Sequence, residues 1–220
     1  MAGLLLFITS VMLILGFIAA EAFYPNYNLS NDKLSDLGAK APMSILPVPA
    51  SDVSIQQPSS IIFNSTVFLA GVLIIISSLL ICRGSKSKIV GRFLVIPGIG
   101  AVIVGLLTEQ MGMIHYIGAI MVFVFGPLTA IVSYRSVKPP FSYLSIALGL
   151  ISLTFVPIVA INIYNALITY TIVVTGGAEN MIVYPFLLWM LALGTYLMSY
   201  PTTTFSCSEE QGLSSKLKPD

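Results

Sequence analysis

Six long apolar stretches, separated by polar segments, dominate the chain of 220 residues. A helix that crosses roughly 30 Å of hydrocarbon needs about 20 mostly apolar residues. Peptide groups inside a bilayer find no water, so a spanning stretch satisfies them internally as a helix. The predicted spans are Gly3–Ala20, Ser60–Cys82, Phe93–Leu107, Ile117–Tyr134, Phe141–Tyr164 and Met181–Tyr200. The third is the shortest, and it extends to Gly91 if Arg92 reaches the interface with its charged end.

The composition agrees with this pattern. Hydrophobic residues make up 56% of the chain and charged residues only 9%, with a mean hydropathy of +0.95. A soluble domain carries roughly 25% charged residues, because its surface faces water. We therefore predict an all-α fold, a polytopic transmembrane bundle of six helices.

Basic residues predict the orientation of the bundle. If six helices alternate, one face receives Arg83, Lys86, Lys88, Arg92, Arg135, Lys138, Lys216 and Lys218, and the other receives only Lys33 and Lys40. Lys and Arg gather in cytoplasmic loops, so both termini are expected in the cytoplasm, with the plasma membrane as the expected location. Residues 1–200 then form a single bundle domain that includes an extracytoplasmic loop over 21–59. Residues 201–220 form a flexible cytoplasmic tail.

The first apolar stretch has a second interpretation. Ala20-Glu21-Ala22 matches the small-x-small pattern of a signal-peptide cleavage site. No Lys or Arg precedes the apolar run, so we expect the stretch to remain as a helix; cleavage would leave five. Asn28-Leu29-Ser30 fits the N-glycosylation pattern, and whether Asn28 is modified stays open.

Glycine and proline spacing predicts how the helices pack. A heptad of glycines predicts a seam of close helix contact along the third helix and its exit. Three prolines lie within the third, fourth and fifth stretches, where each removes a backbone hydrogen bond and is expected to kink its helix. The glycines are Gly91, Gly98, Gly105 and Gly112, and the prolines are Pro97, Pro127 and Pro157. Trp189, in the sixth stretch, is expected to give its indole N–H to an intramolecular partner.

Several short motifs occur in an order that resembles a prokaryotic membrane family, domain of unknown function 998. They are Tyr24-Pro25, Ser35-Asp36-Leu37-Gly38, Phe63-Asn64, Gly71, Glu109 to His115, Gly176-Gly177-Ala178-Glu179-Asn180, Tyr184-Pro185, Leu188-Trp189, Gly194, Tyr196 and Leu197. The resemblance covers about Leu4 to Tyr200 and implies the fold without a reaction. One departure is Asn180, where the family pattern often has an arginine, which puts an ion pair at that position in doubt.

The candidate site residues all fall on the predicted extracytoplasmic side. They are Asp36, Asn64, Glu109, His115 and Glu179. Ionisable groups near a membrane are costly unless they are paired, so a cluster of them marks a candidate ligand-binding site. The alternative is that each side chain simply contacts water at the headgroups.

His115 is the single histidine, and Glu109 lies six residues before it. A histidine titrates near physiological pH, so Glu109 and His115 are the candidate catalytic acid–base pair. The competing interpretation places His115 as a cap of the fourth helix or among headgroups. One histidine with scattered carboxylates does not predict a zinc site, and no cofactor is expected.

Three function classes remain open at this point. A non-enzymatic lipid-binding or scaffold protein comes first, because no Asp, Glu, Lys or Arg lies deep in a span. A small intramembrane enzyme acting on lipid at the outer leaflet comes second, and a transporter comes third, since no inverted repeat is visible. Expected partners are membrane lipids and further membrane subunits, in a homo- or hetero-oligomer. Nucleic acid is not expected, because the basic residues lack interleaved aromatics.

Overall fold

The computed structural model describes residues 1–30, 32–38, 58–84, 88–108, 112–168 and 176–199. In this part of the chain the regular elements are helices. The long ones are α1 (Ala2–Ala22), α2 (Ser59–Gly84), α3 (Lys88–Leu106), α4 (Met113–Val132), α5 (Phe141–Ile168) and α6 (Gly176–Ser199). Two short 3₁₀ helices, η1 (Leu34–Gly38) and η4 (Ser133–Ser136), precede α2 and α5.

All six long helices are long and apolar enough to cross a membrane. This confirms the all-α, six-helix prediction and each predicted span. The bounds differ mainly at polar ends: α3 begins at Lys88, and α6 begins at Gly176 rather than Met181. Polar residues can occupy the first or last turn of a spanning helix, because that turn lies at the interface, so apolar patterning misses them.

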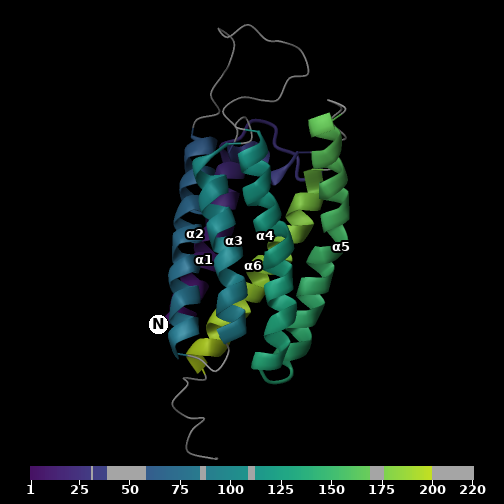
Figure 1. Cartoon of the computed structure of the whole chain (residues 1–220). Coiled ribbons are helices and arrows are strands. Elements are labelled where there is room, and N and C mark those ends of the chain that lie inside the picture. The colour runs from purple at the N-terminus through teal and green to yellow at the C-terminus, as the bar shows by residue number, and fades with distance from the viewer. Residues whose placement is uncertain (31, 39–57, 85–87, 109–111, 169–175, 200–220) are drawn as a thin grey trace, which may run out of the picture.

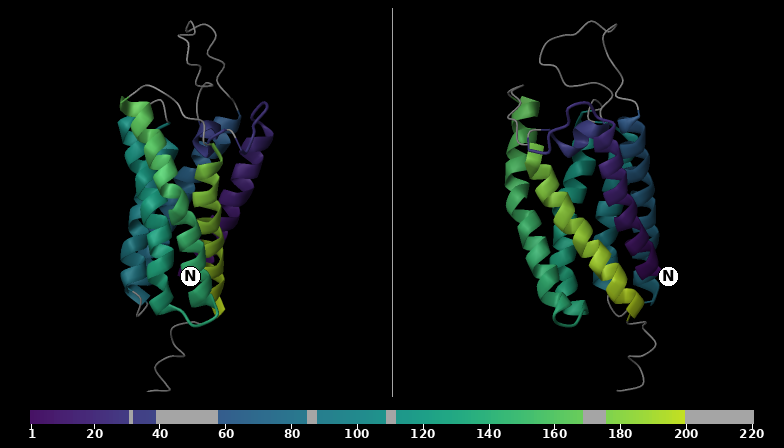
Figure 2. Two further views of the ribbon diagram at one scale, coloured as in Figure 1. Left: turned by 90° about the vertical axis from the view of Figure 1, so that its right-hand side faces the viewer. Right: turned by 180° about the vertical axis from the view of Figure 1, so that it is seen from behind.

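The helices form a closed ring in chain order. Each helix packs against its neighbours in sequence, and α6 closes the ring against α1. Figure 1 shows the helices running along one common axis, and Figure 2 shows α6 crossing the bundle obliquely. Because six spans alternate, the N-terminus and the end of α6 lie at the same end of the bundle.

That end also carries the described basic residues other than Lys33, and it is called the basic end below. Arg83 lies in the last turn of α2, Lys88 begins α3, and Arg135 lies in η4. The opposite end carries η1, so it is called the η1 end. Residues 200–220, including the predicted tail, and residues 31 and 39–57 of the predicted loop lie outside the described residues.

The glycine seam joins α2 and α3. A Cβ added at Gly91 would lie 2.9 Å from the carbonyl oxygen of Ser78, and one added at Gly98 would lie 2.8 Å from Ile75 Cγ1. Gly105 is equally close to Phe68 of α2. The prediction is therefore confirmed for these three glycines. It is wrong for Gly112, which has nothing within 4 Å and adopts a φ of 65° in the turn before α4.

The centre of the bundle is tightly packed toward the basic end. Leu6, Leu94, Trp189 and Met190 are fully buried there. The Trp189 indole donates a hydrogen bond of 3.1 Å to the hydroxyl of Ser133, which confirms the predicted internal partner. A polar group buried in hydrocarbon needs such a partner, because no water is present to replace it. The packing changes toward the η1 end.

Candidate functional site

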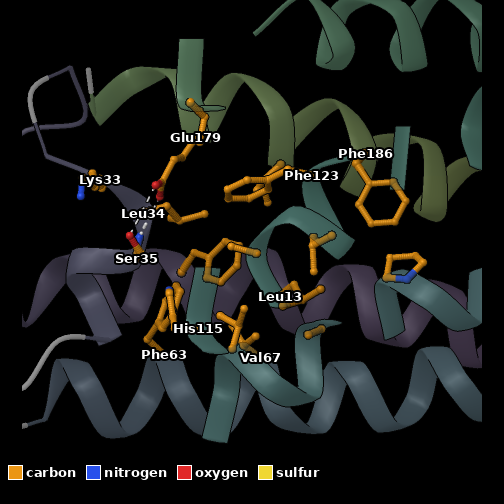
Figure 3. A pocket seen from close by; sticks show the side chains of 18 of the residues that line it. Leu13, Lys33, Leu34, Ser35, Phe63, Val67, His115, Phe123, Glu179 and Phe186 are labelled. Carbon is orange, nitrogen blue, oxygen red and sulfur yellow. Dashed lines mark hydrogen bonds between the residues drawn. The ribbon is translucent and has the colours of Figure 1, made fainter. Parts of the chain in front are cut away.

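A cavity of about 100 Å³ lies inside the ring, between its middle and the η1 end. All six long helices contribute to its wall, and Leu34 and Ser35 of η1 cover it. Figure 3 shows the cavity from close by. Small and β-branched side chains such as Ala70, Ala101 and Val159 line the wall and leave room that larger side chains would fill.

Most of the wall is apolar, and the polar lining residues gather toward the η1 end. They are Lys33, Ser35, His115, Tyr116, Asn162 and Glu179. In Figure 3, Lys33, Ser35, His115 and Glu179 lie toward one end of the cavity and Phe186 toward the other. Four of the six, namely Lys33, Ser35, Tyr116 and Asn162, are partly exposed, so the polar end communicates with the surface. The cavity is therefore amphipathic along its length.

Glu179 lies in the first turn of α6 and is only 8% exposed. Its Oε2 accepts a hydrogen bond of 3.1 Å from the backbone N–H of Ser35, and its Oε1 lies 3.5 Å from the Ser35 hydroxyl. A carboxylate near a helix N-terminus is favoured by the helix dipole. Glu179 thus joins η1 to α6 and gives the cavity a negative charge.

His115 lies in the first turn of α4 and is 3% exposed. Its Nδ1 lies 2.6 Å from the carbonyl oxygen of Leu107, just after α3. A carbonyl only accepts hydrogen bonds, so Nδ1 donates a proton to it, and the tautomer that this bond selects has Nε2 as its acceptor. The side chain neither caps α4 nor lies among headgroups; the bundle buries it because α3 and α4 pack closely there.

Asp36 and Asn64, two further predicted site residues, hold η1 in place and are not part of the cavity wall. The Asp36 carboxylate accepts a bond of 2.8 Å from the backbone N–H of Lys33, which closes the turn. The Asn64 side chain donates to the carbonyl of Gly38 at 3.0 Å, and the Ser59 hydroxyl donates to Leu37 at 3.2 Å. Both bonds join η1 to the beginning of α2.

Glu109, the fifth predicted residue, lies outside the described residues. The structure therefore brings together His115 and Glu179 of the predicted set. It adds Lys33, Ser35, Tyr116 and Asn162 to them. Asn162 had a sequence signal, since it is a polar residue in the last third of a spanning stretch. Ser35 had the motif Ser35-Asp36-Leu37-Gly38, which indicates a capped turn rather than a cavity. Lys33 had no signal, because only the fold of η1 over the bundle places it there.

A second polar cluster lies beside α1 and α6 at the η1 end. The Tyr184 hydroxyl donates to Glu21 at 3.3 Å, and burial raises the pKa of Tyr27, with the charges of Glu21 and Glu179 acting in the same direction. Asn180, 1% exposed, donates to the carbonyl of Leu29 at 3.3 Å. At this position the chain has an amide that fastens the segment before η1, rather than the charge of an arginine.

Metal chemistry finds no support in the part of the chain that the structure describes. No group of three or more His, Cys, Asp or Glu side chains among these residues is placed to hold a metal ion. Cys82, near the basic end, makes a weak contact of 3.7 Å with the carbonyl of Lys88.

A six-helix membrane bundle with a one-ended amphipathic cavity defines the class of this protein. Comparison with protein families then places it further: the family described as "Protein of unknown function (DUF998)" matches residues 7–196. The match covers most of the chain and confirms the resemblance seen in the sequence, so the chain belongs to this family. Neither the curated proteins nor the solved structures gave a match.

Proposed function

We propose that this protein binds a membrane amphiphile in its central cavity, with the polar part of the ligand at the η1 end and an apolar chain inside. The observation that carries the proposal is the wall itself: apolar side chains from all six helices, and a polar end formed by His115, Glu179 and their neighbours. Ligand sites are concave and mostly apolar, with a few polar groups that fix orientation. A membrane supplies such ligands at high local concentration.

Packing at the basic end supports binding over transport. Leu94, Trp189 and Met190 are fully buried where a path would have to continue. Transporters place ionisable or broken-helix sites near the midplane and open them alternately to both sides. The described polar lining residues stay at one end, which is the arrangement of a pocket with one polar mouth.

Catalysis would rest on a pair of side chains, Glu109 and His115, of which the structure describes one. The Leu107 carbonyl holds the His115 ring through Nδ1. No hydrogen bond joins His115 to a serine or cysteine among the described residues, so binding is the function with the most direct support. Conversion of a bound lipid to a product by the purified protein would favour the enzyme alternative.

We further propose that the basic end faces the cytoplasm of the plasma membrane, following the distribution of Lys and Arg. The test is a pair of variants, Lys33→Cys and Arg83→Cys, in a chain whose Cys82 and Cys207 are replaced by serine. A membrane-impermeant maleimide should label Lys33→Cys from outside intact cells and Arg83→Cys only after permeabilisation. Labelling of both from one side would refute the topology.

Native mass spectrometry from mild detergent tests the binding proposal. The wild-type protein should retain a lipid of defined mass, and the same spectrum gives the oligomeric state. Ala119→Trp places an indole in the cavity and should remove that lipid, because Ala119 is buried in the wall. The matched control is Ala160→Trp, the same change at an exposed position of α5, which should keep it.

Folding is controlled separately. Val67→Phe fills the same cavity from α2 with a smaller added volume and should also lower lipid retention. All variants are compared by size-exclusion profile and circular dichroism, so a misfolded variant is recognised. Equal retention of lipid in folded Ala119→Trp, Val67→Phe and Ala160→Trp would show that lipid binds only the outer surface, and the proposal would be wrong.

A further inference from the structure

The residues at the polar end of the cavity indicate which chemical group the head of the ligand carries. Resting on the binding function proposed above, we infer that the ligand is an uncharged, hydroxyl-bearing amphiphile, such as a single acyl chain on a glycerol, and not a phosphate-bearing lipid. Two features carry this inference. They are the balance of charge at the polar end and the hydrogen-bonding direction of His115.

Among the described residues of the wall, the charges at the polar end balance. Lys33 supplies one positive charge, Glu179 supplies one negative charge, and no arginine is among them. Phosphate sites in proteins use an excess of positive charge, with arginine forks or several N–H donors directed at the anion. Here a phosphate would enter a mostly apolar cavity beside the carboxylate of Glu179, whose repulsion would offset the attraction of Lys33. An uncharged head avoids this cost.

The polar end presents hydrogen-bond acceptors, so a ligand head that carries a donor fits it best. The bond from His115 Nδ1 to Leu107 leaves Nε2 as the acceptor of a ring that lines the cavity. The Glu179 carboxylate, which accepts from the Ser35 backbone, is a second acceptor in the wall at this end. A hydroxyl donates to either group. A phosphate diester or an ester oxygen donates to neither.

The size and shape of the cavity favour one chain. Its volume of about 100 Å³ is comparable to apolar cavities that hold one small apolar molecule, so it admits part of one acyl chain. Phe186 lies at the deep end and stacks on Trp189, with ring centroids 5.6 Å apart. Trp189 is the single tryptophan and is fully buried, so its fluorescence reports what reaches this end of the cavity from inside.

Three brominated probes test the inference, because bromine quenches tryptophan on close approach. They carry the same 9,10-dibromostearoyl chain as a monoacylglycerol, as its lysophosphatidic acid and as a methyl ester. Each is titrated into the full-length protein in dodecylmaltoside micelles. The monoacylglycerol should quench Trp189 at a concentration about tenfold lower than either of the others. The methyl ester has no hydroxyl to donate to the acceptors of the site, and the lysophosphatidic acid brings a phosphate beside the Glu179 carboxylate.

Variants locate the effect at the polar end. His115→Phe should raise the half-quenching concentration of the monoacylglycerol about tenfold and leave that of the methyl ester unchanged. Glu179→Gln removes the repelling charge. It should lower the ratio of the half-quenching concentration of the lysophosphatidic acid to that of the monoacylglycerol. Glu21→Gln is the matched control, a carboxyl at the same end that bonds to Tyr184 and lies off the cavity wall, and it should leave this ratio unchanged.

The outcomes separate the inference from the binding function. Stronger quenching by the lysophosphatidic acid, or equal quenching by all three probes, would overturn the inference about the head while the cavity remains a lipid site. If that ratio is the same in Glu179→Gln and Glu21→Gln, Glu179 does not select the head of the ligand, and the role given to the polar end is wrong. If no probe quenches Trp189, and Ala119→Trp keeps its retained lipid, the binding function itself is wrong.

Discussion

Glu179 fastens the cover of the cavity, and its removal has a magnitude that follows from the structure. Glu179→Ala deletes the carboxylate that accepts the Ser35 backbone N–H at 3.1 Å. The second contact, at 3.5 Å, is at the limit of a hydrogen bond and adds little. One hydrogen bond to a charged group contributes about 1.5–3 kcal/mol. Every 1.4 kcal/mol is a factor of ten in a local opening equilibrium, so the Ser35 amide should exchange roughly 10- to 100-fold faster.

Hydrogen–deuterium exchange of peptides that cover residues 32–38 measures this opening. Glu179→Gln keeps one side-chain oxygen as an acceptor, and should raise exchange by less than the alanine variant. Glu21→Ala removes a carboxylate from α1 at the same end, whose partner is Tyr184 rather than η1, and should leave the peptide unchanged. Unchanged exchange in Glu179→Ala, or an equal rise in Glu21→Ala, would refute the role of Glu179 as the anchor of η1.

Three further predictions concern packing and ionisation. Gly71→Ala places a Cβ 2.6 Å from the backbone nitrogen of Val102 in α3, which cannot yield, so thermal unfolding in detergent should show a loss of about 1–3 kcal/mol; Gly84→Ala, with open space around it, should show none. Trp189→Phe should lose about 0.6 kcal/mol of coupling with the Ser133 hydroxyl, measured in a double-mutant cycle with Ser133→Ala. Because burial raises the pKa of Tyr27 above the unfolded value of about 10, the unfolded chain ionises first as pH rises. Stability is then lost above pH 10 or so, and Tyr27→Phe should make the melting temperature less dependent on pH there.

Sequence reasoning located the spanning helices well because the bilayer imposes a constraint that each helix meets by itself. A stretch such as Ser60–Cys82 must be apolar and about 20 residues long whatever its neighbours are. The same holds for the seam glycines Gly91, Gly98 and Gly105, whose heptad spacing keeps them on one helix face. Gly112 has the spacing but lies beyond α3, where the helical face no longer continues.

The candidate site was predicted less completely, because position along the chain gives only depth in the membrane. His115, Glu179, Asp36 and Asn64 were all placed at one end, and all lie there. Which of them line the cavity depends on rotation of the helices about their axes and on the path of η1. The Asp36 side chain bonds to the backbone of Lys33, and the Asn64 side chain bonds to the backbone of Gly38, so neither lines the cavity.

By itself, the sequence determined that this protein is a six-helix membrane bundle with most of its basic residues at one end, since hydrophobic length and charge act on each segment independently. Only the tertiary structure decided that the six helices close into a ring, and that His115 and Glu179 line one amphipathic cavity under η1. The physical reason is that a cavity belongs to no single helix. It is the volume left when the side chains of seven segments, from Leu13 to Leu187, have packed as closely as their shapes allow.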